Sequence, residues 1–222
     1  MHVITSQGRG RANTTVRRRL GAALTTTAAL NLVSRRTLSM HFKRVVFSNA
    51  GLDSPLRALR DLPTEFVALT RENLRDALRA SGSIPMLVEG VSIASAPGGI
   101  HWDGGITDYH LDLDYGDHDG LVLYPHFYSH VVPGWFDKRL TWRRAGETNF
   151  RRTLLLSPSD DFVSQLPNGR IPDRRDFSAM SERQRISAWE NVRAASAALG
   201  DELGALVASG RIADRVESWN AR

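Results

Sequence analysis

The sequence predicts a mixed α/β domain, and three observations support this prediction. Segments typical of strands alternate with segments typical of helices along the chain, as they do in α/β proteins. The length of 222 residues suits one large domain, spanning 1–222, better than two. Hydrophobic residues make up 41% of the chain, which is enough to build a core and excludes collagen-like, coiled-coil and wholly disordered proteins.

The first strand and helix are predicted near the start of the chain. Residues 2–6 are typical of a strand that ends before Gly8. A helix is predicted from Thr14 or Thr15 to about Val33, because apolar residues recur at helical spacing at Leu20, Leu24, Ala28 and Leu32. The next predicted elements are a short helix and a loop, at residues 36–46 and 51–63.

A strand at residues 66–69 is followed by a helix with a clear beginning and end. Thr70 is expected to cap a helix over residues 71–79, in which the apolar face comprises Leu74, Ala77 and Leu78. Gly82 can release this helix, and Pro85 favours extended backbone in the residue before it.

The remaining elements are predicted from apolar runs and capping signals. Four further strands are expected, at residues 91–94, 100–102, 121–125 and 153–157. Ser181 and Gln184 form the pattern of a capping box at the start of a C-terminal helical stretch. Gly200 is expected to bend this stretch and Gly210 to end it.

Charge is unevenly distributed. Residues 1–60 contain eleven basic residues and one acidic residue, a net charge of +10, so residues 61–222 carry −5 of the chain's total of +5. A basic region can attract an anionic membrane, but nucleic acid is not an expected partner. Only Phe42 and Phe47 are aromatic in this region, and no nucleic-acid-reading motif is present.

The chain also excludes several kinds of chemistry and location. It contains no cysteine, which excludes thiol nucleophiles and thiolate metal sites. The longest weakly polar run, residues 20–33, is shorter than the roughly 20 residues of a membrane-spanning helix. Lack of cysteine suits the cytoplasm without excluding other compartments. The expected location is the cytoplasm, and peripheral contact with a membrane is an open alternative.

The main candidate site is Asp103-Gly104-Gly105, at the end of a predicted strand. A strand end holds a carboxylate rigidly, and glycines allow a tight turn with close backbone approach. The same three residues also suit an ordinary β-turn with Asp at its first position.

Two segments in order carry a family resemblance. Residues 73–85 end in Ala80-Ser81-Gly82-Ser83-Ile84-Pro85, and residues 100–108 read Ile-His-Trp-Asp-Gly-Gly-Ile-Thr-Asp. This pattern resembles the C-terminal half of patatin-like phospholipases. The resemblance covers about residues 2–125, and residues 126–222 would form a C-terminal extension that ends in helices.

The resemblance implies a layered α/β fold with a mostly parallel central sheet flanked by helices, lacking its N-terminal strand–helix units. It also implies that Asp103 is the base of a Ser–Asp dyad that hydrolyses lipid esters without a cofactor or metal, with Gly104 and Gly105 supporting the motif. A base beside a serine hydroxyl makes it a competent nucleophile, and backbone N–H groups stabilise the oxyanion.

The chain departs from the family in one respect. A Gly-rich oxyanion loop and a G-x-S-x-G elbow are both missing, and Ser92, the nearest imitation in Gly90–Ala94, lies in a predicted strand rather than at a strand-to-helix turn. No nucleophile is therefore assigned. The sequence is interpreted as part of a patatin-like acyl hydrolase that supplies Asp103 and is inactive alone. The alternative is a non-catalytic fold remnant or a lipid- or protein-binding module.

Two further features leave alternatives open. Residues 108–119 are rich in Asp and His and could bind a divalent cation, although their spacing matches no EF-hand loop and also suits a polar loop and strand. The helix flanked by Arg17–Arg19 and Arg35-Arg36 could rest on lipid headgroups or pack as a core helix with arginines at its ends.

Overall fold

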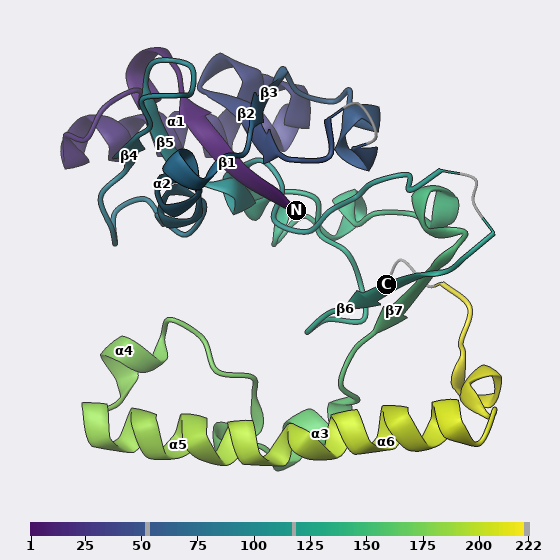
Figure 1. Ribbon diagram of the computed structural model, residues 1–222. Coiled ribbons are helices and arrows are strands. Elements are labelled where there is room, and N and C mark those ends of the chain that lie inside the picture. The colour runs from purple at the N-terminus through teal and green to yellow at the C-terminus, as the bar shows by residue number, and fades with distance from the viewer. Residues whose placement is uncertain (52–53, 117–118, 220–222) are drawn as a thin grey trace. The chain divides into compact units, whose positions relative to one another are not determined.

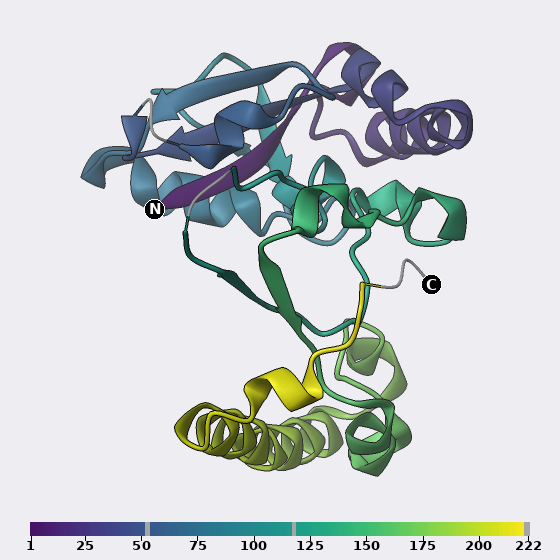
Figure 2. The ribbon, with the colours of Figure 1, turned by 90° about the vertical axis from the view of Figure 1, so that its right-hand side faces the viewer.

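A computed structural model describes residues 1–51, 54–116 and 119–219. These residues divide into two compact units, each described here by itself (Figures 1 and 2). The first unit contains the described residues of 1–119 and 130–152, and the second contains 120–129 and 153–219. The expectation of a single domain over 1–222 stays a prediction. Within the described residues, no helix combines the length and apolar character needed to cross a membrane.

The first unit is built on a five-stranded sheet with the order β3-β2-β1-β5-β4. Its strands are β1 (His2–Gly8), β2 (Phe42–Ser48), β3 (Thr64–Ala68), β4 (Val91–Ser92) and β5 (Ile100–Asp103). The chain is therefore a mixed α/β protein, as predicted.

The direction of the strands corrects one expectation. Only β2 and β3 are parallel, whereas β1 runs antiparallel to both β2 and β5, and β4 runs antiparallel to β5. The prediction of a mostly parallel central sheet is wrong for this sheet. A connection of seven residues between β4 and β5 is too short for the crossover that a parallel pair needs.

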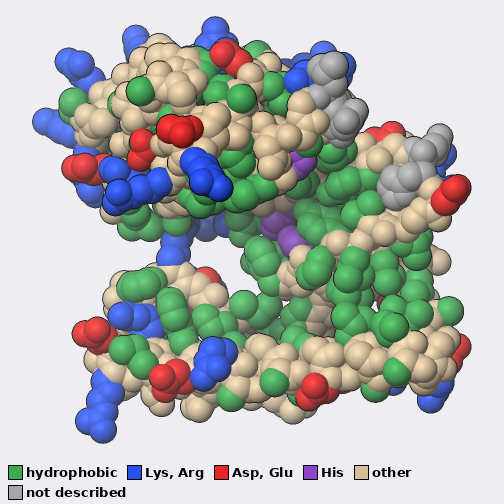
Figure 3. Space-filling view, viewed as in Figure 1, with side chains coloured by type: hydrophobic (Ala, Val, Ile, Leu, Met, Phe, Trp, Pro, Cys, Tyr) green, Lys and Arg blue, Asp and Glu red, His purple; other side chains and the backbone are tan. Residues whose placement is uncertain are grey.

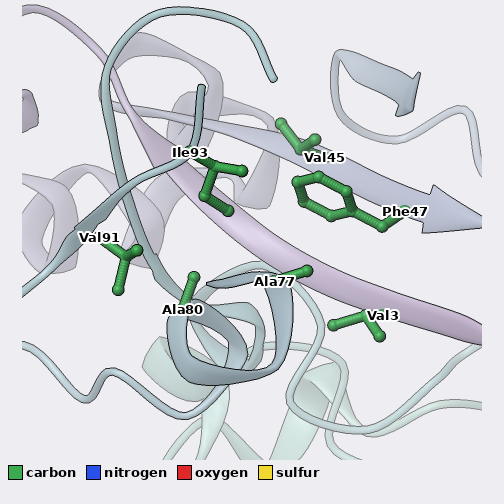
Figure 4. Packing of buried hydrophobic residues seen from close by; sticks show 7 residues of the cluster. All are labelled: Val3, Val45, Phe47, Ala77, Ala80, Val91 and Ile93. Carbon is green, nitrogen blue, oxygen red and sulfur yellow. The ribbon is translucent and has the colours of Figure 1, made fainter. Parts of the chain in front are cut away.

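Two helices lie on opposite faces of this sheet. Helix α2 (Arg71–Ser81) packs Ala77 and Ala80 against Val3, Val45, Phe47, Val91 and Ile93 (Figure 4). Helix α1 (Arg17–Val33) packs on the other face, near Phe42 and Trp102. Thr70 caps α2 through the backbone N–H of Asn73, as predicted.

The buried stripe of α1 differs from the predicted one. The structure buries Leu20, Ala23, Thr27 and Asn31, whereas Leu32 is 58% exposed. No side chain caps the helix at Val16, so the prediction of a cap at Thr14 or Thr15 is wrong. Thr27 and Asn31 can be buried because each has a hydrogen-bond partner: Thr27 bonds His41, and Asn31 bonds Asp137.

The helix predicted over residues 36–46 is confirmed only as far as Met40 and is wrong beyond it. A 3-10 helix, η2 (Arg35–Met40), is followed directly by strand β2. The Val45-Val46 pair favours a strand, and pairing with β1 over seven residues decides the conformation.

The second unit contains a parallel pair of strands and four helices. The strands are β6 (Val122–Pro125) and β7 (Thr153–Leu156), both close to their predicted positions. The helices are α3 (Asp160–Gln165), α4 (Asp176–Ala179), α5 (Glu182–Ala195) and α6 (Ala197–Ala208). Ser181 and Gln184 form the predicted capping box, but the break between α5 and α6 falls at Ser196 instead of Gly200.

The second unit buries few apolar side chains. Among its described residues, only Leu166 is a buried hydrophobic residue. Hydrophobic side chains are visible along α5 and α6 in Figure 3. Large exposed ones in this unit include Leu121, Leu123, Phe177, Ile186 and Val207.

Candidate functional site

Asp103 ends β5 in a closely defined position. Its backbone N–H donates a hydrogen bond of 3.0 Å to the carbonyl of Ser83, and its residue position lies opposite Thr5 in the β1–β5 ladder. Its carboxylate accepts a hydrogen bond of 2.8 Å from the backbone N–H of Gly105. The carboxylate is therefore fixed by the turn that follows the strand.

The two glycines of the motif serve different purposes. A Cβ atom on Gly104 would lie 2.3 Å from the carbonyl oxygen of Ile4, which no real contact allows, so only glycine fits against β1. A Cβ atom on Gly105 would lie 3.1 Å from Oδ1 of Asp103. Gly104 thus allows the close approach of the turn to β1, and Gly105 leaves room around the carboxylate.

The surroundings of Asp103 shift the pKa of its carboxyl group. Partial burial raises the pKa of the Asp103 carboxyl, and this effect outweighs the opposing contributions of the Gly105 N–H and the Lys138 ammonium group. The Lys138 ammonium lies 3.8 Å from the centre of the Tyr109 ring, in a cation–π contact. A rigid, partly buried carboxylate with a raised pKa is a group suited to accept and return a proton.

The described residues do not place a nucleophile beside Asp103. Within 1–51, 54–116 and 119–219, no serine or threonine hydroxyl bonds its carboxylate. Ser92 is exposed in β4, opposite Ile100, and does not occupy a strand-to-helix turn. The hydroxyl of the buried Ser83 donates to the carbonyl of Arg79.

The acidic segment that could bind a cation divides its side chains among separate partners. His110 Nδ1 accepts from the N–H of Val132, Asp112 accepts from Asn149, and Asp114 accepts from the N–H of Gly116. Asp117 and His118 lie outside the described residues. In the part of the chain that is described, no three His, Asp or Glu side chains are grouped as metal ligands.

A buried ion-pair network was not predicted from the sequence. Arg44 on β2 bonds Asp108 and Asp61, and Arg35 lies within 4.0 Å of Asp61, Asp108 and Asp137. Arg35 is therefore a paired side chain and not part of a solvated basic surface. Among these residues, only Arg44 could have been suspected from the sequence. It lies in an apolar run between Phe42 and Val45-Val46, and a buried arginine needs a partner of opposite charge.

The network fixes the segment that follows the candidate site. Asp108 lies five residues after Asp103, and its carboxylate joins the turn to the middle of β2 through Arg44. Arg35 adds a hydrogen bond from its guanidinium group to the carbonyl of Thr107. The position of the Asp-Gly-Gly turn is therefore set on one side by β1 and on the other by this network.

Comparisons with known proteins add no relative to this description: no family model, curated protein or solved structure matches the chain.

Proposed function

We propose that Asp103 is the general base of a serine acyl hydrolase of the patatin-like type, acting on lipid esters. The observation that supports this most strongly is the state of the carboxylate. It is fixed by the Gly105 N–H, its pKa is raised by burial, and it remains partly accessible at the end of β5. The patatin-like layering of the fold is part of the same proposal.

The chemistry asked of Asp103 is a proton transfer. The carboxylate takes the proton of a serine hydroxyl as the oxygen attacks the ester carbonyl, and later returns a proton during release of the product. A raised pKa makes the carboxylate a better proton acceptor at neutral pH. The reaction requires no metal and no cofactor.

The serine is proposed to come from polypeptide outside these 222 residues. No serine among the described residues bonds Asp103, and the sequence contains no G-x-S-x-G elbow. This same observation favours a second candidate function, in which the chain binds a lipid or protein and hydrolyses nothing.

The experiment uses the native protein, isolated from its source through a C-terminal tag placed at the chromosomal locus. The protein is treated with a fluorophosphonate probe, and labelled peptides are identified by mass spectrometry. We expect one labelled serine outside the 222 residues, together with hydrolysis of p-nitrophenyl butyrate. Absence of both labelling and hydrolysis would overturn the hydrolase proposal and support the binding function.

The role of Asp103 is tested in the same native protein. Asp103→Asn keeps the acceptor for the Gly105 N–H and is expected to lower the hydrolysis rate about 10²–10⁴-fold, as for loss of a general base. Asp112→Asn is the matched control, because burial also raises the pKa of Asp112. We expect its rate to stay within about twofold of the wild type. Equal rates for wild type and Asp103→Asn would remove Asp103 from the mechanism.

A further inference from the structure

An exposed apolar loop lies beside the basic start of α1. Leu87 is 62% exposed and Val88 is 52% exposed, and the N–H groups of both residues donate to the carbonyl of Ile84. Met86, just before them, has a φ of 71°, a conformation that residues other than glycine rarely adopt. The loop is therefore a fixed turn that presents two large apolar side chains to solvent.

Packing places this loop against α1. Met86 belongs to the apolar cluster that contains Leu20 and Leu24, and its Cε would lie 3.8 Å from a Cβ atom on Gly21. Arg17 and Arg18 precede Gly21 by four and three residues, so they lie on the same side of the helix, one turn away. Both arginines are exposed.

The two segments that form this surface carry a net positive charge. Arg17, Arg18 and Arg19 fill the first turn of α1, and the described residues 1–51 contain no acidic side chain. Glu89 is the single acidic residue of the loop segment 82–90. In Figure 3, Lys and Arg side chains project from the first unit on the side where Figure 1 draws α1.

We infer that this surface, which comprises Val16, Arg17, Arg18, Leu87 and Val88, binds anionic lipid bilayers. Apolar side chains that enter the interface, beside arginines that contact phosphate headgroups, are the combination by which peripheral proteins bind membranes. Val16 adds a third exposed apolar side chain, at 51%. The inference goes beyond the proposed hydrolysis and does not depend on it.

A bilayer fits this surface better than nucleic acid does. Nucleic-acid-binding surfaces combine basic residues with exposed aromatic side chains on which bases stack. The two aromatic residues of the basic region, Phe42 and Phe47, are completely buried. The exposed apolar residues of the surface are aliphatic.

The surface is close in the chain to the candidate site. The loop segment 82–90 includes Ser83, whose carbonyl accepts the hydrogen bond from the N–H of Asp103. Binding through Leu87 and Val88 would therefore hold the Asp103 turn near a lipid surface, where an ester substrate resides.

The first experiment measures co-sedimentation of the 222-residue chain with vesicles of phosphatidylcholine containing 30% phosphatidylglycerol, and with vesicles of phosphatidylcholine alone. We expect binding to the anionic vesicles that weakens with salt, and little binding to the neutral ones. Arg17→Gln/Arg18→Gln and Leu87→Ser/Val88→Ser should each weaken binding about tenfold or more.

Two control variants carry equivalent changes elsewhere on the first unit. Arg71→Gln/Arg75→Gln removes two exposed arginines from α2, and Leu32→Ser/Val33→Ser removes two exposed apolar side chains at the far end of α1. Both should bind within about twofold of the wild type. Equal losses in the controls and the test variants would overturn the assigned surface.

A second measurement does not depend on loss of binding. Because the chain lacks cysteine, Leu87→Cys and Val33→Cys each provide one site for an environment-sensitive fluorophore. A blue shift on adding anionic vesicles is expected at position 87 and not at position 33. The inference is wrong if neither position shifts, or if a 20-nucleotide RNA binds while the vesicles do not. Neither vesicle binding nor the fluorescence shift requires a nucleophile. A negative result in these measurements would therefore count against the membrane surface and not against the hydrolase proposal.

Discussion

The guanidinium group of Arg44 donates two hydrogen bonds of 2.6 Å to the carboxylate of Asp108, and the two side chains are 0% and 4% exposed. Breaking a buried ion pair leaves one charge without its partner, which is much more costly than replacing both members. The pair joins β2 to the segment after the Asp-Gly-Gly turn. Its loss should therefore affect both the stability of the first unit and the order of the turn.

We predict that Asp108→Asn lowers the free energy of unfolding by about 3 kcal/mol, measured by urea denaturation. Asp114→Asn, a change at an exposed position, should cost less than about 1 kcal/mol. Arg44→Met/Asp108→Leu removes both charges and should cost less than Asp108→Asn alone. A double variant less stable than the single one would contradict the assignment of the cost to an unpaired charge.

Asp103→Asn is expected to stabilise the protein at neutral pH while strongly lowering the proposed activity. Because the folded pKa of Asp103 is raised, the wild-type protein loses stability as the pH rises from about 3.9, the usual unfolded value, through the folded pKa. Asparagine carries no charge and avoids this loss. The gain should be about 0.5–1 kcal/mol at pH 7, the scale of a stabilising substitution that removes a functional constraint.

The measurement is the unfolding free energy of both proteins between pH 3 and pH 8. The difference should vanish at the acidic end, where both side chains are neutral, and become constant above the folded pKa. A difference independent of pH would show that ionisation of Asp103 is not its cause.

Gly104→Ala should destabilise the protein by about 1–3 kcal/mol, because the new methyl group meets the Ile4 carbonyl and the turn must move away from β1. Gly98→Ala is the control, since a Cβ atom there meets no other atom within 4 Å. Thermal unfolding separates the two outcomes: a lower Tm is expected for Gly104→Ala, and little change for Gly98→Ala. Similar Tm values for both variants would exclude the close approach at Gly104.

Limited proteolysis with trypsin should cut the second unit first. Local opening is easiest where few apolar side chains are buried, and Leu166 is the only buried hydrophobic residue among the described residues of this unit. Arg183 and Arg193 in α5 should be cleaved before Arg71 and Arg75 in α2, although all four are exposed. A time course by mass spectrometry gives the order, and earlier cleavage in α2 would contradict the prediction.

Much of the secondary structure could be predicted because its signals are local. The strands at 2–6 and 100–102, the cap at Thr70 and the capping box at Ser181 depend on residues close in sequence. The helix predicted over 36–46 was wrong beyond Met40 because β2 is decided by its pairing with β1, more than thirty residues away. The prediction of parallel strands was wrong for a similar reason, since the direction of each strand depends on how distant segments are connected and paired.

The candidate site was predictable in part. The turn at Asp103-Gly104-Gly105 follows from its glycines, and the structure gives each of them a separate reason to be present. Its support was not predictable, because Arg44 and Asp108 are 64 residues apart and a single sequence does not show which charges meet. The polar stripe of α1 was missed because Thr27 and Asn31 are buried by distant partners, His41 and Asp137.

The parallel pairing of β6 and β7 limits how the two units can be produced as separate fragments. Parallel strands need a long connection, and here residues 130–152 of that connection belong to the first unit. Trimming the gene from its 3′ end therefore cannot yield the first unit cleanly. A stop after residue 152 leaves β6 as an orphan strand with an open edge, and a stop after residue 119 also deletes part of the first unit. Only excision of both stretches, with a linker in place of residues 120–129, would separate the two.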